Sequence, residues 1–298
     1  MLDDHGLAFL ASLPRHFSFD KAALCQWHSV RPSIMNALAS TFICMAMLST
    51  TFAAEKDTRC YELRTYYAAP GKLDELHARF REHTRKIFEK HHMSNIGYWV
   101  PLENTDDRLI YLLAFPSREA HDQSWKDFGN DPEWKEVARK SEANGRLVSR
   151  IESVLLNATD YSPEIRPARA AGSRVFELRT YTASSGNLDA LDERFRSHTL
   201  KLFSKHGMEH VGYWHLLADK DQNKEAKKTN RADNTLIYLL SHRSKEAADA
   251  SFNAFRNDPE WISVKGASEK KAGGPLTEGG QAGVKSVFLK ATDYSPMQ

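Results

Sequence analysis

Polar and apolar residues alternate along Cys60–Ala68, a stretch rich in tyrosine and threonine, and this pattern predicts a β-strand. After Gly71, apolar residues recur at helical spacing from Leu73 to Phe88, which predicts a helix with one apolar face and charges opposite. Ile96–Leu102 and Leu109–Phe115 have the composition of two further strands, joined by a short polar turn.

A second helical region follows these strands. Ser117 is a suitable N-cap for a helix that runs through Phe128, and Asp131-Pro132 resembles a cap followed by a first-turn proline, which restarts the helix. Leu147–Ala158 is the last predicted strand. The order β-α-β-β-α-β is the ferredoxin-like motif, an antiparallel four-stranded sheet with both helices on one face.

The whole unit occurs twice. The block that begins CYELRTYYAAPGKLDELHARF at Cys60 returns at Val175 as VFELRTYTASSGNLDALDERF, and through Trp99 and Trp214 the two blocks agree at more than half of their positions without a gap. The segments NDPEW and ATDYSP also recur in both copies. The second copy carries two insertions, Lys220–Asn234 and Gly273–Gly283, whose polar or glycine-rich composition predicts surface loops.

The repeat predicts the fold class. We expect an α+β protein in which two tandem ferredoxin-like βαββαβ domains form a pseudo-symmetric α+β barrel, because each sheet has an open face that the other sheet can cover. The expected boundaries are a leader over 1–54, domain 1 over 58–163, a linker over 164–173 and domain 2 over 174–298.

The leader has the features of an export signal. Its apolar core, 37–54, carries no charge and ends in small residues, which is typical of a secretory signal peptide. Cleavage is expected after Ala53 or Ala54, so the mature protein would be secreted or periplasmic.

Several alternatives remain open for this segment. Translation begins at Met1 or at Met35, and the apolar core is close to the lower length limit for an uncleaved membrane anchor. A mitochondrial transit peptide is disfavoured, because such peptides are amphipathic and poor in acidic residues, whereas this leader contains Asp3, Asp4 and Asp20.

Composition narrows the classes of partner. The 298 residues are 41% hydrophobic and 27% charged with a net charge of +2, and no long basic stripe suggests a nucleic-acid surface. Three cysteines occur, of which only Cys60 would remain after cleavage. One thiol cannot form an internal disulfide, and we interpret Cys60 as a buried strand residue rather than a nucleophile, because Val175 replaces it in the second copy.

The first strand of each copy supplies a candidate binding face. Period-two geometry places Glu62, Arg64 and Tyr66 on one side of the strand and Tyr61 and Leu63 on the other. We expect the apolar side to pack on the helices and the Glu-Arg-Tyr side to point into the barrel, where it would line a small-molecule pocket. The alternative is a structural network in which the glutamate pairs with the arginine.

Aromatic and histidine residues complete the predicted site. His83 and His198 fall on the apolar stripe of the first helix, where a histidine is a satisfied core residue, a general base or an axial haem ligand. Trp99 and Trp214 would supply apolar walls, with plain core packing as the alternative. The predicted ligand-binding residues are Glu62, Arg64, Tyr66, His83, Trp99, Glu177, Arg179, Tyr181, His198 and Trp214.

Familiar catalytic motifs are missing from the sequence. We find no glycine-rich phosphate loop, no G-x-S-x-G elbow, no H-E-x-x-H and no paired C-x-x-C elements. We therefore name no catalytic residue and no metal ligand, expect no cofactor, and favour a binding protein over an enzyme. Haem is the alternative cofactor, and a cofactor-independent monooxygenase-like or haem-linked enzyme is the alternative function.

The E-L-R-T-Y strand, the G-Y-W after the first helix, the N-D-P-E-W segment and the closing strand resemble the NIPSNAP family, over nearly all of Cys60–Pro296 and in both copies. The resemblance implies a ferredoxin-like domain of the dimeric α+β-barrel group and no agreed catalytic residues. Animal members are associated with mitochondria and with vesicle or mitophagy roles. We expect a small-molecule ligand or a protein partner, no nucleic acid and no stable membrane span after cleavage, with a homo-oligomer formed through strand edges as a further hypothesis.

Overall fold

The computed structural model describes residues 57–167, 172–217 and 234–298. The leader and most of the first insertion therefore lie outside the described residues. Among the described residues, no helix combines the length and the apolar character that a membrane crossing requires.

The first copy follows the predicted element order, with strand and helix ends shifted by one or two residues. Its elements are β1 (Cys60–Ala68), α1 (Leu73–Arg79), a π-helical turn (Phe80–Thr84), α2 (Arg85–Lys90), β2 (Ser94–Pro101), β3 (Arg108–Phe115), α3 (Arg118–Asn130), α4 (Pro132–Ser141) and β4 (Val148–Ala158).

The second copy repeats this order. Its elements are β5 (Val175–Thr182), α5 (Leu188–Arg194), a π-helical turn (Phe195–Thr199), α6 (Leu200–Lys205), β6 (Glu209–Leu216), β7 (Thr235–His242), α7 (Lys245–Arg256), α8 (Pro259–Ala272), a short 3-10 helix (Gly280–Gly283) and β8 (Val284–Ala291). The 3-10 helix lies within the glycine-rich insertion, which is a loop as predicted.

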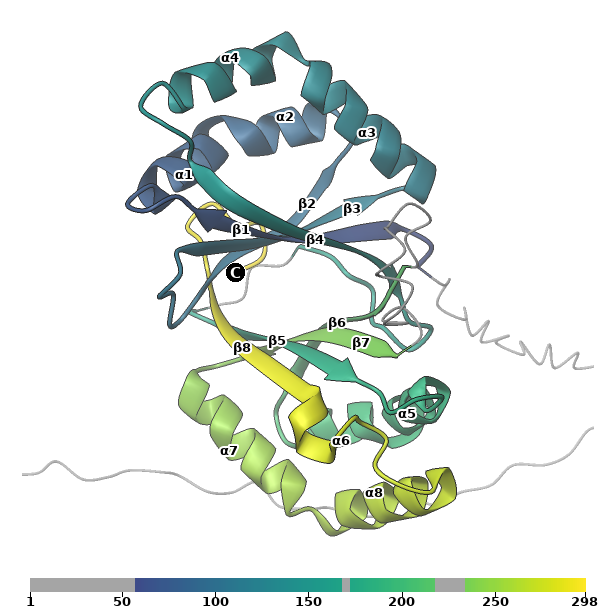
Figure 1. Cartoon of the computed structure of the whole chain (residues 1–298). Coiled ribbons are helices and arrows are strands. Elements are labelled where there is room, and N and C mark those ends of the chain that lie inside the picture. The colour runs from purple at the N-terminus through teal and green to yellow at the C-terminus, as the bar shows by residue number, and fades with distance from the viewer. Residues whose placement is uncertain (1–56, 168–171, 218–233) are drawn as a thin grey trace, which may run out of the picture. The chain divides into compact units, whose positions relative to one another are not determined.

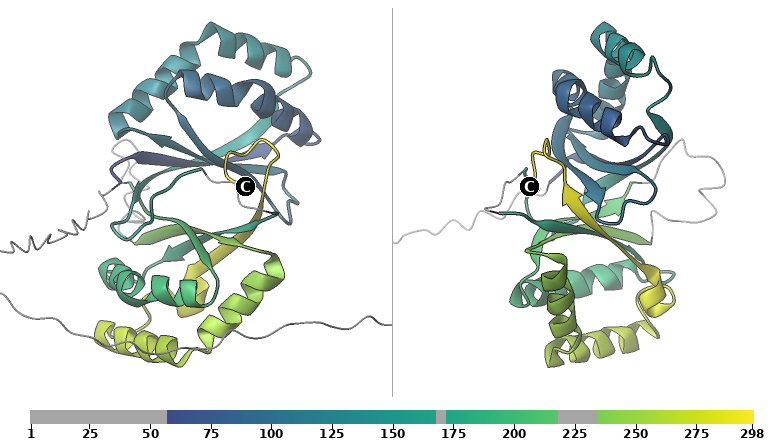
Figure 2. Two further views of the ribbon diagram at one scale, coloured as in Figure 1. Left: turned by 180° about the vertical axis from the view of Figure 1, so that it is seen from behind. Right: turned by 90° about the vertical axis from the view of Figure 1, so that its left-hand side faces the viewer.

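All eight strands form one closed barrel in the order β1-β3-β2-β8-β5-β7-β6-β4. Each copy contributes an antiparallel sheet, with long ladders between β1 and β3 and between β1 and β4 in the first copy. The two sheets face each other and each carries its helices on the outside (Figures 1 and 2). The predicted eight-stranded pseudo-symmetric barrel is confirmed.

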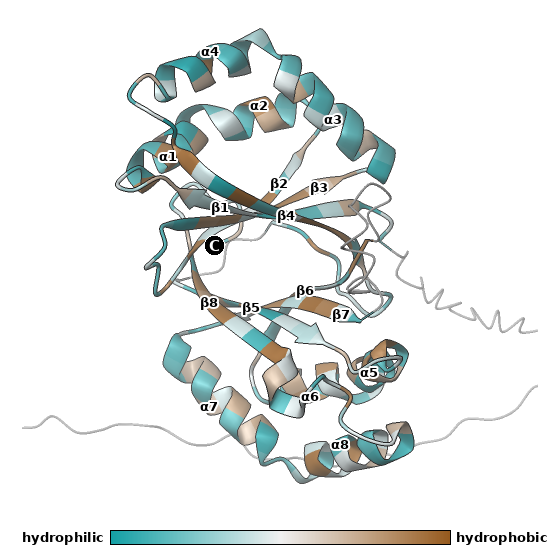
Figure 3. Cartoon of the chain, viewed as in Figure 1, coloured by the Kyte–Doolittle hydropathy of each residue, from teal (hydrophilic) through white to brown (hydrophobic). Residues whose placement is uncertain are grey.

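Three apolar layers stabilise the molecule. One fills the barrel between the two sheets and includes Leu63, Trp99, Leu178 and Trp214. The other two lie between each sheet and its own helices. The outermost helix α4 is largely hydrophilic (Figure 3) and buries none of its residues, as expected for a helix that covers the others from the solvent side.

Helix caps explain the repeated NDPEW segment. The Ser117 hydroxyl accepts a hydrogen bond from the Ala120 backbone N–H, and the Asp131 carboxylate accepts one from Glu133. Each is a standard N-cap contact that satisfies a backbone donor of the first turn. Trp134 then packs on Phe128, with ring centroids 4.5 Å apart. The prediction that Asp131-Pro132 caps and restarts the helix is confirmed.

The repeated ATDYSP segments tie the two copies together. The Thr159 backbone N–H donates to the Tyr213 carbonyl at 2.9 Å, and the Thr292 N–H donates to the Tyr98 carbonyl at 2.9 Å. Each segment therefore continues from the last strand of its own copy onto the second strand of the other. Beyond the first of these segments, Ile165 of the predicted linker is fully buried in the barrel layer.

Candidate functional site

The predicted Glu-Arg-Tyr face does not line the barrel. Glu62 accepts hydrogen bonds from the Trp125 indole at 2.6 Å and contacts His121 Nε2 at 3.2 Å, and both of these residues belong to α3. The face therefore points toward the helices, and our prediction of its direction was wrong. A closed eight-stranded barrel has an interior just wide enough for side chains, so it takes the apolar face of β1, whereas the wider helix–sheet space admits a charged network.

Glu62 is the centre of that network in the first copy. Arg64 donates to its carboxylate at 2.6 Å, and the Ser153 hydroxyl donates to the same oxygen. Burial alone raises the pKa of Glu62, but the His121 bond, the Arg64 charge and the Ser153 bond outweigh it and lower that pKa to about 2. Glu62 is thus a buried, ionised carboxylate.

The second copy rebuilds the same network from partly different residues. Glu177 contacts Arg179, Ser286 and His242, with His242 Nε2 at 3.2 Å from its Oε2. His242 occupies the position of Phe115 at the end of the third strand, whereas the position of His121 is taken by Ala248. The histidine has changed its place in the sequence but not its contact with the glutamate.

The glutamate, arginine and tyrosine of β1 and β5 form a hydrogen-bonded network within each copy. Within each copy the glutamate, arginine and tyrosine are brought together, since Arg64 also approaches the Tyr66 hydroxyl at 3.5 Å and Arg179 approaches that of Tyr181 at 3.4 Å. The glutamate pairs with the arginine of its own copy, as in the structural alternative. Their ligand-binding role stays a prediction.

The barrel interior is filled. Trp99 and Trp214 are each 1% exposed, and the space that the interior side chains leave measures about 10 Å³. This volume is at the lower limit for a single water molecule. The two tryptophans therefore pack the core, and the expected pocket between the sheets does not form.

His83 and His198 do not lie on the apolar stripe. The side chain of His83 is 49% exposed, while the next residue, Thr84, is buried. The cause is the π-helical turn at Phe80–Thr84, which adds one residue to the turn and rotates the following positions. Ideal 3.6-residue spacing had placed His83 inside, and that prediction was wrong. His198 lies within the same turn of the second copy and is half-buried.

His91 and His206 are the C-cap residues of α2 and α6, and each contacts a carboxylate of another helix. His91 Nε2 lies 2.6 Å from the carboxylate of Asp131, and His206 Nε2 lies 2.7 Å from that of Asp258. Each histidine therefore joins the end of one helix to the N-cap of another. These contacts stabilise the helix layer and leave the two imidazoles out of any site.

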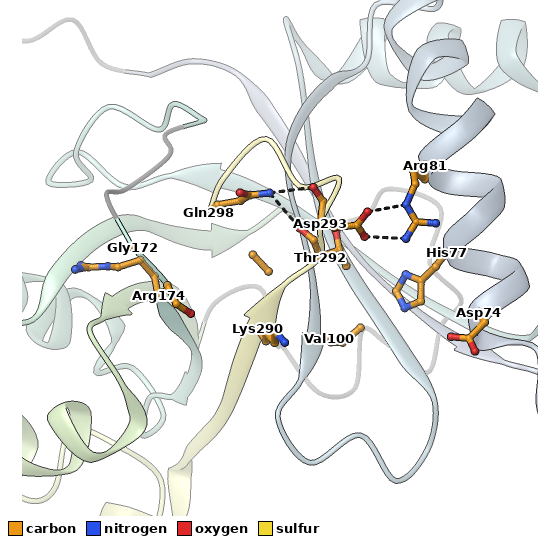
Figure 4. A pocket seen from close by; sticks show the side chains of 12 residues that line it. Asp74, His77, Arg81, Val100, Gly172, Arg174, Lys290, Thr292, Asp293 and Gln298 are labelled. Atoms are coloured by element: carbon orange, nitrogen blue, oxygen red, sulfur yellow. Dashed lines mark hydrogen bonds and ion pairs between the residues drawn. The ribbon is translucent and has the colours of Figure 1, made fainter.

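An open cleft of about 900 Å³ lies where the two copies meet. Figure 4 shows its walls, with Asp74, His77 and Arg81 from one helix on one side, Lys290 from β8 at its centre and Arg174 across from the helix. Val100 of β2, Thr292, Asp293 and Gln298 complete the lining. None of the residues that the sequence predicted as a ligand site takes part.

Two fixed contacts hold one wall of the cleft. Arg81 donates to both carboxylate oxygens of Asp293, at 2.7 and 2.8 Å, and such a bidentate pair fixes the geometry of both groups. His77 Nδ1 lies 2.7 Å from the Tyr294 hydroxyl. Burial, with a contribution from the Arg81 charge, lowers the pKa of His77, so its imidazole is neutral at pH 7.

Two charged groups in the cleft are free to meet a ligand. Within residues 57–167, 172–217 and 234–298, neither the Lys290 ammonium nor the Asp74 carboxylate has a hydrogen bond or an ion pair. Arg174 is engaged by Glu209 and Ser241. The cleft thus presents one free cation, one free anion and one neutral imidazole on a rigid wall.

The pseudo-symmetric position in the second copy differs. Asp192 stands in place of His77 and contacts the Tyr161 hydroxyl at 2.6 Å and His215 Nε2 at 3.0 Å, so its carboxylate already has partners. Asn157 takes the place of Lys290. The free lysine charge of the cleft therefore has no counterpart at the other end of the barrel.

Two further kinds of site, a metal site and a cysteine nucleophile, find no support in the part of the chain that the structure describes. No group of three or more His, Cys, Asp or Glu side chains there is placed to hold a metal ion. Cys60 is buried, and burial raises the pKa of its thiol to about 11, which is unfavourable for a nucleophile. The interpretation of Cys60 as a buried strand residue is confirmed.

The NIPSNAP family model matches residues 61–163. An uncharacterised NIPSNAP-like domain protein from Burkholderia xenovorans is 21% identical with a TM-score of 0.33, over 36% of this chain and 91% of that one. A putative monooxygenase from Lactobacillus acidophilus is 12% identical with a TM-score of 0.47, over 78% and 94%. An anthrone oxidase-like protein is 13% identical with a TM-score of 0.49, over 80% and 93%. The curated proteins contain no match.

Proposed function

We propose that the chain, whose residues 61–163 match the NIPSNAP family model, is a binding protein that holds a small polar molecule with an acidic group in its cleft. The observation that carries the proposal is the Lys290 ammonium, which has no partner among the described residues and lies in a cleft of about 900 Å³. Ligand pockets of this size with a few placed polar groups are typical of small-molecule sites.

The cleft supplies the contacts that such a ligand needs. A carboxylate or phosphate of the ligand pairs with Lys290, and a neighbouring polar group bonds to the neutral imidazole of His77, whose ring the Tyr294 hydroxyl orients. Val100 contributes an apolar surface. Because Arg81 and Asp293 neutralise each other, Lys290 supplies the uncompensated positive charge that selects an anion, and Asp74 favours ligands that also carry a donor.

The test is a thermal-shift screen of small organic acids on the purified protein, repeated with Lys290→Ala and with Lys285→Ala. Lys285 is an exposed residue of the same strand that does not line the cleft. A ligand at one hundred times its Kd stabilises by about 2.7 kcal/mol, so we expect a shift of several degrees in the wild type and in Lys285→Ala but not in Lys290→Ala. The proposal fails if no acid shifts the melting temperature, or if both variants respond alike.

The enzymatic alternative has one observation in its favour. His77 is a neutral imidazole with one nitrogen fixed by Tyr294 and its ring in the cleft (Figure 4), which is the arrangement a general base needs. A His77→Asn variant separates the two functions. Under the binding proposal it retains the ligand with weaker affinity, whereas under the enzymatic alternative any turnover of the bound acid disappears.

Export is part of the proposal. The expected signal peptide and its cleavage point at Ala53 or Ala54 lie outside the described residues, and the first described strand, β1, begins at Cys60. Amino-terminal sequencing of the protein from the periplasmic or secreted fraction of its host tests this step. A mature N-terminus near residue 54 supports export, and an intact leader in the cytoplasmic fraction contradicts it.

A further inference from the structure

The barrel closes through short contacts, and among the described residues these leave much of β4 without a strand partner on one side. β4 pairs with β6 only at Leu156, Asn157 and Ala158. The preceding part of β4, residues 148–154, is paired with β1 on one side. Within 57–167, 172–217 and 234–298, no strand is paired with its other side.

The backbone groups at this open edge are defined by the strand geometry. The Leu217 N–H donates to the Leu155 carbonyl at 2.7 Å, so Leu155 points away from β1. In an antiparallel strand the N–H and C=O of one residue point to the same side and successive residues alternate. Ile151 and Ser153 therefore direct both of their backbone hydrogen-bonding groups to the open edge, whereas the register of β4 on β1 shifts at Ser149.

The side chains along this edge are exposed and include a hydrophobic one. Ile151 is 48% exposed and is one of few large hydrophobic residues of the described chain with that exposure. Arg150 and Glu152 are 56% and 53% exposed and contact each other. An exposed strand edge with an isoleucine at its centre is a template for pairing with another strand.

The order of residues around Ile151 is self-complementary. When a second β4 is laid antiparallel on the first with Ile151 opposite Ile151, Arg150 of each copy lies opposite Glu152 of the other. The backbone groups of Ile151 then face each other as a hydrogen-bonded pair, as the geometry above requires. Opposite charges across strands stabilise such a pair, and like charges destabilise it.

Charges on an edge strand commonly serve to prevent association. In β4, Arg150 and Glu152 disfavour pairing with a second β4 strand in the neighbouring registers. Antiparallel pairing centred on Arg150 or on Glu152 opposes like charges, and so does parallel in-register pairing. Only the register centred on Ile151 matches both charges and hydrogen bonds.

The second copy has only a shorter open edge, without this order of charges. Its equivalent strand β8 begins at Val284, the counterpart of Ile151, and Lys285 replaces Glu152. The glycine-rich 3-10 helix stands in front of it in place of the longer N-terminal part of β4. The feature therefore belongs to one copy and does not follow from the repeat.

The geometry points to a homodimer with two-fold symmetry, formed by antiparallel pairing of the β4 edges about Ile151. This interaction is independent of the ligand cleft. A pairing of this length buries a small area, so the dimer is weak and depends on concentration.

A charge exchange tests the dimer. Sedimentation velocity over a range of concentrations is measured for the protein purified from its host and for Arg150→Glu, Glu152→Arg and the double variant. Each single change places two like-charged pairs in the interface, so we expect the dissociation constant to rise about tenfold. The double variant restores both pairs and is expected to dimerise like the wild type. Glu136→Arg on the exposed face of α4 is the control and should change nothing.

Cysteine cross-linking tests the register. In a hydrogen-bonded antiparallel pair the opposed Cα atoms are about 5.5 Å apart, which suits a disulfide. Ile151→Cys should therefore give a covalent dimer on mild oxidation, while Ser149→Cys, which would face Ser153, should give far less. The wild type is the control for cross-linking through the native cysteines. The proposal is overturned if the wild type is a monomer at every concentration. It is also overturned if the double variant dimerises as weakly as the single variants, or if both cysteine variants cross-link equally.

Discussion

His242 Nε2 lies 3.2 Å from Oε2 of Glu177, although the first copy makes the corresponding contact from a different element. There the histidine is on α3, and in the second copy it ends β7. A buried glutamate paired with an arginine has remaining lone pairs that need donors, and each copy has met this need with an imidazole. The network therefore requires a histidine at a point in space rather than at a point in the sequence.

This requirement predicts the outcome of a transplant. His121→Ala leaves Glu62 one donor short and should lower the free energy of unfolding by about 1–3 kcal/mol. Adding Phe115→His creates the arrangement of the second copy and should recover most of that loss. Urea denaturation of the wild type, the single variant and the double variant measures this. A double variant less stable than His121→Ala would mean that the lost packing of the Phe115 side chain, which is buried, outweighs the new hydrogen bond.

Acid stability should depend on the two N-cap aspartates. Hydrogen bonds from Lys90 and His91 lower the pKa of Asp131, and Lys205 and His206 lower that of Asp258. A lowered pKa means that the carboxylate stabilises the fold above its ordinary pKa and that this contribution is lost as pH falls through the folded value. Asp131→Asn should therefore be less stable than the wild type at pH 7, and the difference should shrink below about pH 4.

The measurement is the urea midpoint at pH 7, 5 and 3, with Asp127→Asn on the exposed face of α3 as the control. We expect the control to follow the wild type at each pH. A difference between Asp131→Asn and the wild type that stays constant from pH 7 to pH 3 would show that Asp131 acts only as a neutral hydrogen-bond acceptor for the helix end.

The π-helical turn predicts a contrast between adjacent residues. His83 is exposed, so His83→Ala should change the free energy of unfolding by less than about 0.5 kcal/mol. Thr84 is buried and donates to the Arg79 carbonyl at 3.2 Å, so Thr84→Val should cost about 1 kcal/mol. Thermal unfolding of both variants, and of Thr199→Val in the second copy, tests whether the turn is the same in solution. A larger loss for His83→Ala than for Thr84→Val would contradict the π-helical turn and favour a regular α-helix with His83 on its buried face.

The same turn shows where sequence reasoning succeeds and where it stops. The element order and the barrel follow from period-two strands, helical spacing and an internal repeat. All three can be recognised directly in the amino-acid sequence. A single extra residue in a helix, such as the one between Phe80 and Thr84, leaves no mark in composition. Direction is equally hidden, because alternation says which residues of β1 share a face but not whether the helices or the opposite sheet cover that face.

The cleft was beyond sequence analysis for a different reason. Its free cation, Lys290, is in β8 and its imidazole, His77, is in α1, so only the closure of the barrel brings them together. A usable signal did exist in the repeated ATDYSP segment, which carries Asp293 and Tyr294. A polar motif kept in both copies beyond the last strand predicts a contact, but its partners on the opposite copy cannot be read from spacing.

The last prediction concerns the way in which the barrel interior is filled. A Cβ atom added to Gly97 would lie 2.2 Å from the Trp99 ring, which is buried without space to move. Gly97→Ala should therefore cost about 1–3 kcal/mol through overpacking, whereas Gly129→Ala in α3, where a Cβ meets nothing within 4 Å, should be neutral or stabilise by up to about 1 kcal/mol. If the clash with Trp99 is the cause, Trp99→Leu should cost less in the Gly97→Ala background than in the wild type. Additive losses in the double variant would instead place the role of Gly97 in the β-bulge that interrupts the ladder between β2 and β3.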